Sequence, residues 1–90
     1  MANVRIPTPL RKLTNDLEVV SAAGANVGEV LENLEKAFPG MRERLYDAQG
    51  SVRRTLLIYV NDEDIREQQE LATPIKDNDE VSLIPAYAGG

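Results

Sequence analysis

The sequence lacks two residue types on which much protein chemistry depends: its 90 residues include no cysteine and no histidine. Without cysteine there is neither a disulfide framework nor a thiolate nucleophile. Without histidine the commonest general base and metal ligand is also missing. The composition therefore excludes zinc sites of the Cys/His type and catalysis by Ser-His or Cys-His pairs.

Long hydrophobic runs are also missing. No apolar segment approaches the roughly 20 residues needed to span a bilayer, and residues 1–5 do not lead into an apolar signal-peptide segment. We therefore expect no membrane association and a cytoplasmic protein. The hydrophobic fraction of 42% and the charged fraction of 28% are typical of one globular domain with a small core.

Positive charge is scarce. The chain has 15 acidic and 10 basic residues, a net charge of −5 and a sequence pI of about 4.6. Two small basic clusters, Arg11-Lys12 and Arg53-Arg54, have no interleaved aromatic residues on which bases could stack. We interpret both as solvated loop positions and expect no nucleic-acid binding. Such an acidic domain is better suited to contact a basic protein surface.

One segment, 27–38, has the pattern of an amphipathic helix. Apolar side chains recur there at the spacing of one helical face, namely at Val27, Val30, Leu31, Leu34 and Phe38. Asn26 is a good N-cap residue, and Glu29 follows it three residues later, as in a capping box. Pro39-Gly40 predicts the end of this helix, and residues 41–45 are expected to add a further turn.

Four segments have strand character, and turn or proline residues bound them. They are 3–6, 17–22, 55–60 and 81–84. An irregular connection is expected between the last two strands, anchored by Ile65, Leu71 and Ile75, and followed by a polar turn over 76–79. The element order predicts an α+β fold in which one helix packs on one face of the sheet.

The strand over 55–60 is apolar on both faces. Leu56, Ile58 and Val60 alternate along it with Leu57 and Tyr59. One face must meet the helix. The other face is therefore either an exposed patch or is covered by a further segment.

The sequence ends in Gly89-Gly90, beyond the last predicted strand. These glycines could be a frayed end, but a backbone without Cβ atoms also fits a narrow channel of another protein. A carboxylate there is a poor electrophile until its oxygen becomes a leaving group, which adenylation with ATP achieves. The chain has no G-x-x-x-x-G-K-[ST] phosphate-binding loop. An activating enzyme would therefore have to act in trans.

The C-terminal region 71–90 combines a leucine, a polar turn, an apolar strand, a proline and Ala-Gly-Gly. Together with the segments 4–11 and 58–66, it resembles the MoaD/ThiS family of ubiquitin-like sulfur carriers, and most closely the branch that supplies sulfur for cysteine biosynthesis. The resemblance covers nearly the whole chain. It implies a ubiquitin-like β-grasp fold with a mixed sheet of about four to five strands. We expect this domain to span 1–85 and a flexible tail to span 86–90.

The resemblance implies a role for each residue of the tail. Gly90 matches the terminal glycine whose carboxylate is adenylated and then converted to a thiocarboxylate. Gly89 matches the second glycine, which lies in the enzyme channel. The approach segment consists of Ala88, Tyr87 and Ala86. Family members often have a second proline and a β-branched residue in this segment. Ala86 and Tyr87 depart from that pattern, and the departure concerns the choice of partner more than the chemistry.

The same resemblance implies partners. The chain would be a carrier and not an enzyme, with no cofactor of its own, and an E1-like adenylyltransferase of the MoeB/ThiF type would use ATP and Mg. A rhodanese or cysteine desulfurase would donate sulfur to the carrier. A PLP-dependent cysteine synthase is the favoured acceptor, and a JAMM-type zinc peptidase is a further candidate partner.

Other functions remain open from the sequence. Within the family, the alternatives are the small subunit of molybdopterin synthase, acting with its large subunit, and a thiazole-forming system. From different classes, the alternatives are a ubiquitin-like modifier joined to lysines through Gly90 and a plain interaction domain whose tail does nothing.

Strand parity predicts a docking patch. Val81 and Leu83 share one face of the last strand, so Ile84 can join Leu57 and Tyr59 on the opposite face of the sheet. Such a patch resembles the surface by which ubiquitin-like proteins contact their activating enzymes. The alternative is that loops of the chain cover it.

Three consecutive acidic residues, Asp62, Glu63 and Asp64, could suggest a metal or catalytic site. Consecutive side chains on a turn diverge, however, whereas hard cations need convergent oxygens. We therefore interpret them as a solvated turn. Asn78 stands where the family usually has glycine before the last strand, and asparagine tolerates the left-handed conformation expected there.

Overall fold

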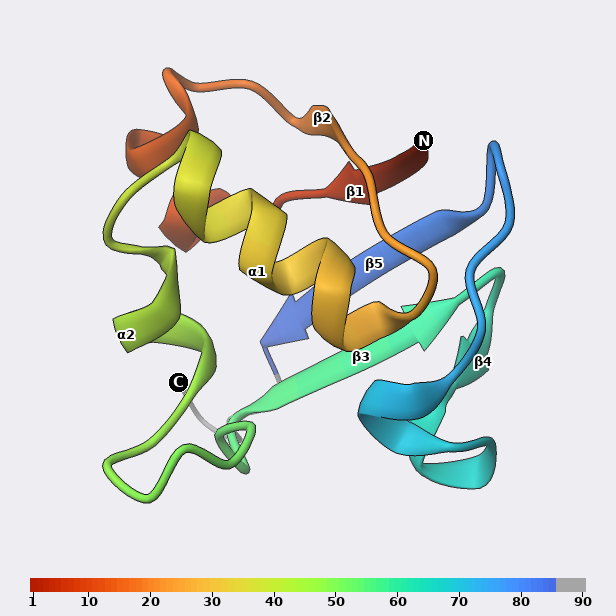
Figure 1. Ribbon diagram of the computed structural model, residues 1–90. Helices are drawn as coiled ribbons and strands as arrows, with labels where there is room; N and C mark the ends of the chain where they lie inside the picture. The colour runs from red at the N-terminus through yellow and green to blue at the C-terminus, as the bar shows by residue number, and fades with distance from the viewer. Residues whose placement is uncertain (86–90) are drawn as a thin grey trace.

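A computed structural model of the chain describes residues 1–85 (Figure 1). Its strands are β1 (Ala2–Arg5), β2 (Val19–Ala22), β3 (Leu56–Val60), β4 (Glu63–Asp64) and β5 (Glu80–Pro85). Its α-helices are α1 (Val27–Ala37) and α2 (Met41–Leu45), and its 3-10 helices are η1 (Thr8–Thr14), η2 (Ile65–Glu67) and η3 (Glu70–Ala72). The element order agrees with the predicted α+β class.

The strands form one mixed sheet in the order β2-β1-β5-β3-β4. β1 runs parallel to β5, whereas the β1–β2, β3–β5 and β3–β4 pairs are antiparallel. Strands β1 and β2, which are consecutive strands of the chain, therefore form an antiparallel pair. β5 occupies the centre of the sheet, with β1 on one side and β3 on the other.

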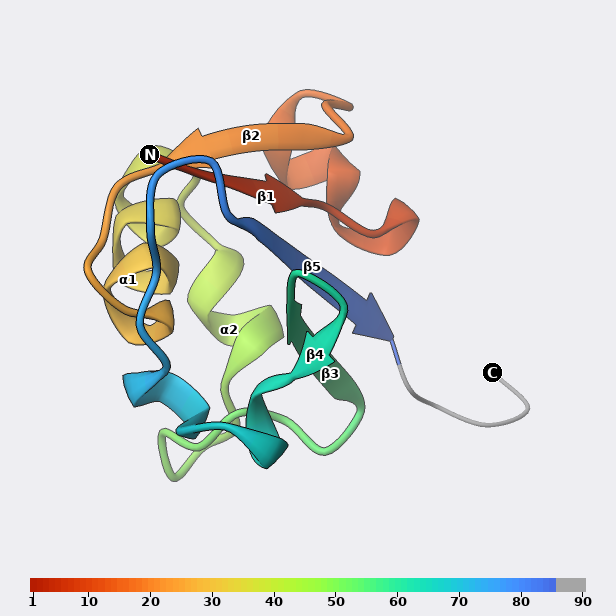
Figure 2. The same cartoon turned by 90° about the vertical axis from the view of Figure 1, so that its right-hand side faces the viewer.

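The main helix packs on one face of this sheet, and α2 lies on the same side (Figure 2). The stripe predicted for α1 supplies its buried residues, which are Val27, Val30, Leu31 and Leu34. They join one hydrophobic core with buried strand residues such as Val4, Ile58 and Val81. Truncating a core side chain such as Leu34 to alanine should cost about 2–5 kcal/mol of stability.

The helix begins at the predicted cap. The Asn26 side chain accepts a hydrogen bond from the main-chain N–H of Glu29 at 2.9 Å, and the Glu29 carboxylate accepts one from the N–H of Ala25 at 3.0 Å. The first bond satisfies one of the unpaired donors of the first helical turn, and the second holds the residue that precedes the cap. Phe38 is the C-cap rather than the last helical residue, so the helix ends one residue before the predicted boundary.

Two irregular regions contain structure that the sequence does not predict. Residues 8–14 form η1, and Leu10 within it is buried in the core. In the connection after β3, Ile65 is buried and begins η2, while Leu71 in η3 and Ile75 pack against the core as predicted. These apolar anchors explain why short 3-10 turns are stable there.

The predicted solvated turn over Asp62–Asp64 is wrong in its second half. Asn61 and Asp62, both with positive φ, form a two-residue hairpin loop, and Glu63–Asp64 pairs with β3 as β4. Asn78 has φ of 70°, which confirms the left-handed conformation predicted for it. Within residues 1–85 no helix is long and apolar enough to cross a membrane.

Candidate functional site

The outer face of the sheet, opposite α1, carries the predicted docking residues. Leu57 and Ile84 are direct partners in the antiparallel β3–β5 pair, and Tyr59 is the partner of Ser82. Partners across an antiparallel pair share a face, so Leu57, Tyr59 and Ile84 form one surface, which we call the outer patch. Ile84 is 40% exposed, and Leu57 and Tyr59 are partly exposed.

The alternating residues of the same strands point inward. Ile58, Val81 and Leu83 are buried in the core beneath the helix. The predicted strand parity is therefore confirmed, and the alternative in which loops bury the outer patch is wrong for Ile84. Docking by this patch remains a prediction.

Charged side chains surround the outer patch. Asp64 is the partner of Tyr59 in the β3–β4 pair. Its carboxylate lies 2.7 Å from the Arg66 guanidinium, and its side chain is 12% exposed. Side-chain and main-chain hydrogen bonds from Arg66 lower the pKa of this carboxyl group. On the other side, Arg5 lies 3.7 Å from Glu80. The patch is thus an apolar surface with paired charges at its margin.

One residue of this face was not predicted. Val19 lies on the edge strand β2, pairs with Arg5 of β1 and is 43% exposed. The contrast between Val19 and the buried Val20 follows the same period-2 pattern that identified Leu57 and Tyr59. Strand parity applied to 17–22 could therefore have found it.

The other predicted site residues lie outside the described residues. They are Ala86, Tyr87, Ala88, Gly89 and Gly90. The last described residue before them, Pro85, pairs with Leu56 at the end of β5 and the start of β3. The last described residue is thus held in the β3–β5 pair.

A cavity of about 460 Å³ lies beside Pro85. Its lining includes Leu56 and Pro7 together with three charged residues, Glu43, Arg44 and Arg53. The Arg53 guanidinium donates hydrogen bonds of 2.9 and 3.1 Å to the main-chain oxygen of Glu43. This bond joins the loop before β3 to α2 and brings basic side chains to the end of β5.

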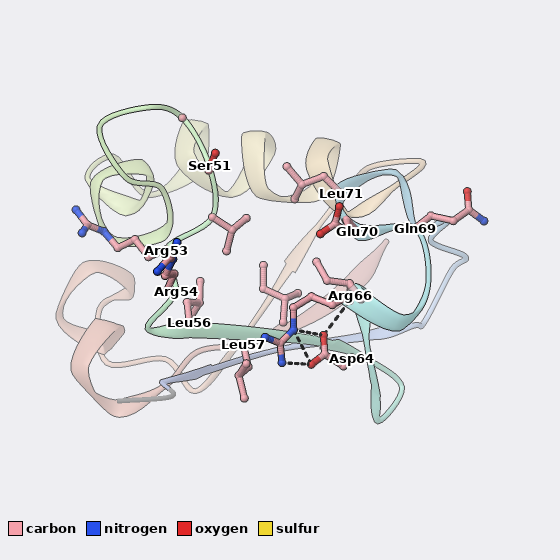
Figure 3. Close-up of a pocket in the computed structure, with 14 residues that line it drawn as sticks. Ser51, Arg53, Arg54, Leu56, Leu57, Asp64, Arg66, Gln69, Glu70 and Leu71 are labelled. Carbon is pink, nitrogen blue, oxygen red and sulfur yellow. Dashed lines mark hydrogen bonds and ion pairs between the residues drawn. The ribbon is translucent and has the colours of Figure 1, made fainter. Parts of the chain in front are cut away.

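A larger cavity, of about 780 Å³, lies between the 50–54 loop and the segment 64–71 (Figure 3). Arg53 and Arg54 lie at one end of it, and the Arg66–Asp64 pair lies near Leu57. Its mixed lining holds no histidine or cysteine that could act on a substrate. Within residues 1–85, no group of three acidic, histidine or cysteine side chains could hold a metal ion.

Comparison with known proteins connects this geometry to a family. Residues 4–90 match the ThiS family. The chain is 47% identical over 89 residues to the sulfur carrier protein CysO of Mycobacterium tuberculosis, a match that covers 97% of this chain and 96% of that protein. It is 35% identical over 66 residues to small archaeal modifier protein 3 of Haloferax volcanii, covering 73% and 71% of the two chains.

A solved structure agrees with the fold. The chain superposes with a TM-score of 0.92 on a chain in the crystal structure of the Amycolatopsis orientalis BexX/CysO complex, at 38% identity and full coverage of both chains. The predicted ubiquitin-like β-grasp fold is thereby confirmed. Because the family match extends over almost the entire sequence and a full-length relative is nearly half identical, this chain belongs to the ThiS family of ubiquitin-like sulfur carriers.

Proposed function

We propose that this chain carries sulfur as a thiocarboxylate on Gly90 and supplies it for cysteine biosynthesis. The observation that carries the proposal is the family match through residue 90, on a sequence ending in Gly89-Gly90. The similarity to CysO, a named sulfur carrier, supports the same chemistry.

The chemistry follows from the carboxyl group. It is ionised near neutral pH, since its pKa is about 3.5, and it must first be activated. An E1-like enzyme of the MoeB/ThiF type uses ATP and Mg: the Gly90 carboxylate oxygen bonds to the α-phosphorus, and pyrophosphate leaves. A sulfur nucleophile then attacks the carbonyl carbon, and AMP leaves. Because the chain has no cysteine, sulfur must be held at this main-chain position.

Partners follow from this sequence of steps. A rhodanese or cysteine desulfurase provides the sulfur as a persulfide, whose attack on the adenylate forms an acyl disulfide. A second thiol then cleaves the sulfur–sulfur bond, which leaves a thiocarboxylate on the carrier and joins the two thiol sulfurs in a disulfide. A PLP-dependent cysteine synthase receives the carried sulfur. A JAMM-type zinc peptidase would act after the acceptor. The outer patch of Leu57, Tyr59 and Ile84 contacts the activating enzyme, since partly exposed apolar side chains surrounded by paired charges are typical of a protein interface.

Intact-mass spectrometry tests the central step. After incubation with the cognate activating enzyme, ATP, Mg and sulfide, the carrier should gain about 16 Da, because sulfur replaces one oxygen. A Gly90 deletion is the matched control and should gain nothing while keeping its far-UV circular dichroism spectrum. If the full chain gained no mass from an enzyme that forms its adenylate, the thiocarboxylate would be the wrong product.

A second function, conjugation to lysines through Gly90, is favoured by the 35% identity to small archaeal modifier protein 3. It predicts isopeptide adducts of this chain in cell extracts. Tryptic digestion followed by mass spectrometry would detect them as a C-terminal remnant on target lysines. The same Gly90 deletion should abolish them, whereas free thiocarboxylate without adducts would favour the carrier function alone.

A further inference from the structure

The charges of this domain are sorted between the two ends of its central strands. At the end where β3 finishes and β5 begins, the two turns and the strand residues next to them include five acidic residues, which are Asp62, Glu63, Asp77, Asp79 and Glu80. At the opposite end, where β5 finishes at Pro85, basic residues line the adjoining cavities. The net charge of −5 therefore conceals a polarised molecule.

Three arginines form the basic end: Arg44 on α2, and Arg53 and Arg54 just before β3. Arg44 and Arg53 line the cavity that contains Pro85, and Arg53 and Arg54 line the neighbouring cavity. The side chains are exposed. The carboxylate of Glu43 lines the first cavity, and those of Asp64 and Glu70 line the second. The ion pairs within residues 1–85 engage the Met1 ammonium group, Arg5, Arg11 and Arg66, and they leave these three arginines without a carboxylate partner.

Arg53 has a structural task, whereas the other two have none that the structure shows. Its guanidinium donates to the main-chain oxygen of Glu43, which keeps α2 beside the loop. No side-chain hydrogen bond of Arg44 or Arg54 occurs within residues 1–85. Arg44 lines the cavity beside Pro85 and Arg54 lines the neighbouring one, so two exposed and unpaired positive charges are available near the end of β5 for a partner surface of complementary charge.

We propose that Arg44, Arg53 and Arg54 form a contact surface for acidic side chains around the channel of the activating enzyme that receives residues 86–90. This inference rests on the proposed function. It assigns acidic side chains to the partner surface, whereas the net charge of this chain predicts a basic one. The acidic end faces away from such a partner, so the charge distribution orients the carrier with Pro85 leading.

Nucleic acid is a poorer match for this surface. Base stacking needs aromatic side chains among the basic ones, and the arginines have none between them in the cavity beside Pro85. The overall negative charge would also oppose a polyanion at long range, whereas a compact acidic rim meets only the basic end.

Charge reversal with a matched control tests the proposal. The pair R44E/R54E alters the basic end and leaves the Arg53 bond intact, while K36E/K76E changes the net charge equally at exposed positions away from Pro85. We expect R44E/R54E to lower kcat/KM for carrier adenylation about tenfold at low salt, and the loss to disappear near 1 M salt, where the screening length is about 3 Å. K36E/K76E and the charge-conserving R44K/R54K should stay within about twofold of the wild type.

The two hypotheses fail in distinguishable ways. If the wild type is never adenylated, the proposed function is wrong. If the wild type is adenylated and the two reversed pairs lose the same activity at every salt concentration, only net charge matters and the contact surface does not exist. Thermal unfolding of each variant excludes misfolding, and tight binding of a fluorescent oligonucleotide that R44E/R54E abolishes would assign the surface to nucleic acid instead.

Discussion

Asn61 and Asp79, which are 18 residues apart, hold together the two turns at the acidic end of the sheet. The Asn61 amide donates to the Asp79 carboxylate at 2.9 Å, and the Asn61 carbonyl oxygen accepts from the main-chain N–H of Glu80 at 2.9 Å. The same carboxylate accepts from the N–H of Lys76 at 2.8 Å. One asparagine thus fixes both the exit of β3 and the entry of β5.

Replacing Asn61 with alanine should lower the free energy of unfolding by about 1–2 kcal/mol, because two hydrogen bonds are lost and alanine disfavours positive φ. Asn61→Gly is the matched control, since glycine accepts the φ of 49° but forms no side-chain bond. Urea denaturation should therefore rank the glycine variant between wild type and alanine. Equal stability of all three proteins would contradict a role for these bonds.

Acid should destabilise the domain in a defined pH range. A main-chain hydrogen bond from Lys76 and one from the Asn61 amide lower the pKa of Asp79, and the Arg66 hydrogen bonds lower that of Asp64. A carboxyl group with a lowered folded-state pKa stabilises the fold above its unfolded pKa of about 3.9 and loses that contribution as pH falls through the folded value.

Urea denaturation from pH 7 to pH 2 measures this effect. We expect little change in unfolding free energy above about pH 5 and a decline below about pH 4. The variant D64N/D79N should start lower and decline less steeply. A wild-type curve as shallow as that of the variant would show that neither carboxyl group has a lowered pKa.

The outer patch should matter for binding but not for folding. Ile84→Asp places a charge on a side chain that is 40% exposed, so the domain should stay folded and lose only about 1–2 kcal/mol of stability, from lower β-propensity and lost apolar burial. Binding to the activating enzyme should weaken by at least about tenfold, measured by titration calorimetry, because a charge is desolvated at an apolar contact. Ser21→Asp, at an exposed position of the edge strand β2, is the control and should bind as wild type does.

Two glycines with positive φ should respond differently to alanine. A Cβ at Gly24 would lie 2.6 Å from the main-chain nitrogen of Val30 in α1, whereas one at Gly50 would meet nothing within 4 Å. Gly24→Ala should therefore cost about 3 kcal/mol or more, and Gly50→Ala only the conformational strain of about 1 kcal/mol. Melting temperatures by calorimetry would check the order, and equal shifts would contradict the steric argument.

The parts of the fold that local patterns determine could be predicted. The α1 stripe and the Asn26 cap depend on residues within one helical turn of each other, and the two faces of β3 follow from alternation. β4 could not be predicted, because a two-residue strand is defined by its pairing with Tyr59 and Val60 rather than by its own propensity. η1 could not be predicted either, because burial of Leu10 by distant segments stabilises it.

The functional site likewise has a part that local patterns determine and a part that contacts between distant segments determine. The outer patch could be predicted because Leu57, Tyr59 and Ile84 lie on regular strands whose parity fixes their faces. The basic end could not, since Arg44 and Arg53 are brought together by the Arg53–Glu43 bond, a contact between a helix and a loop. Composition alone gives the net charge of −5 and not its distribution between the two ends of the sheet.

The parallel pairing of β1 with β5 has a mechanical consequence. Met1 precedes the start of β1, and Pro85 is the end of β5, so opposing forces on the two ends of residues 1–85 pull these neighbouring strands along their length. In that shear geometry the hydrogen bonds between the strands bear load together instead of opening one after another. A partner that pulls on the chain beyond Pro85 while the Met1 end is held would therefore load these hydrogen bonds together.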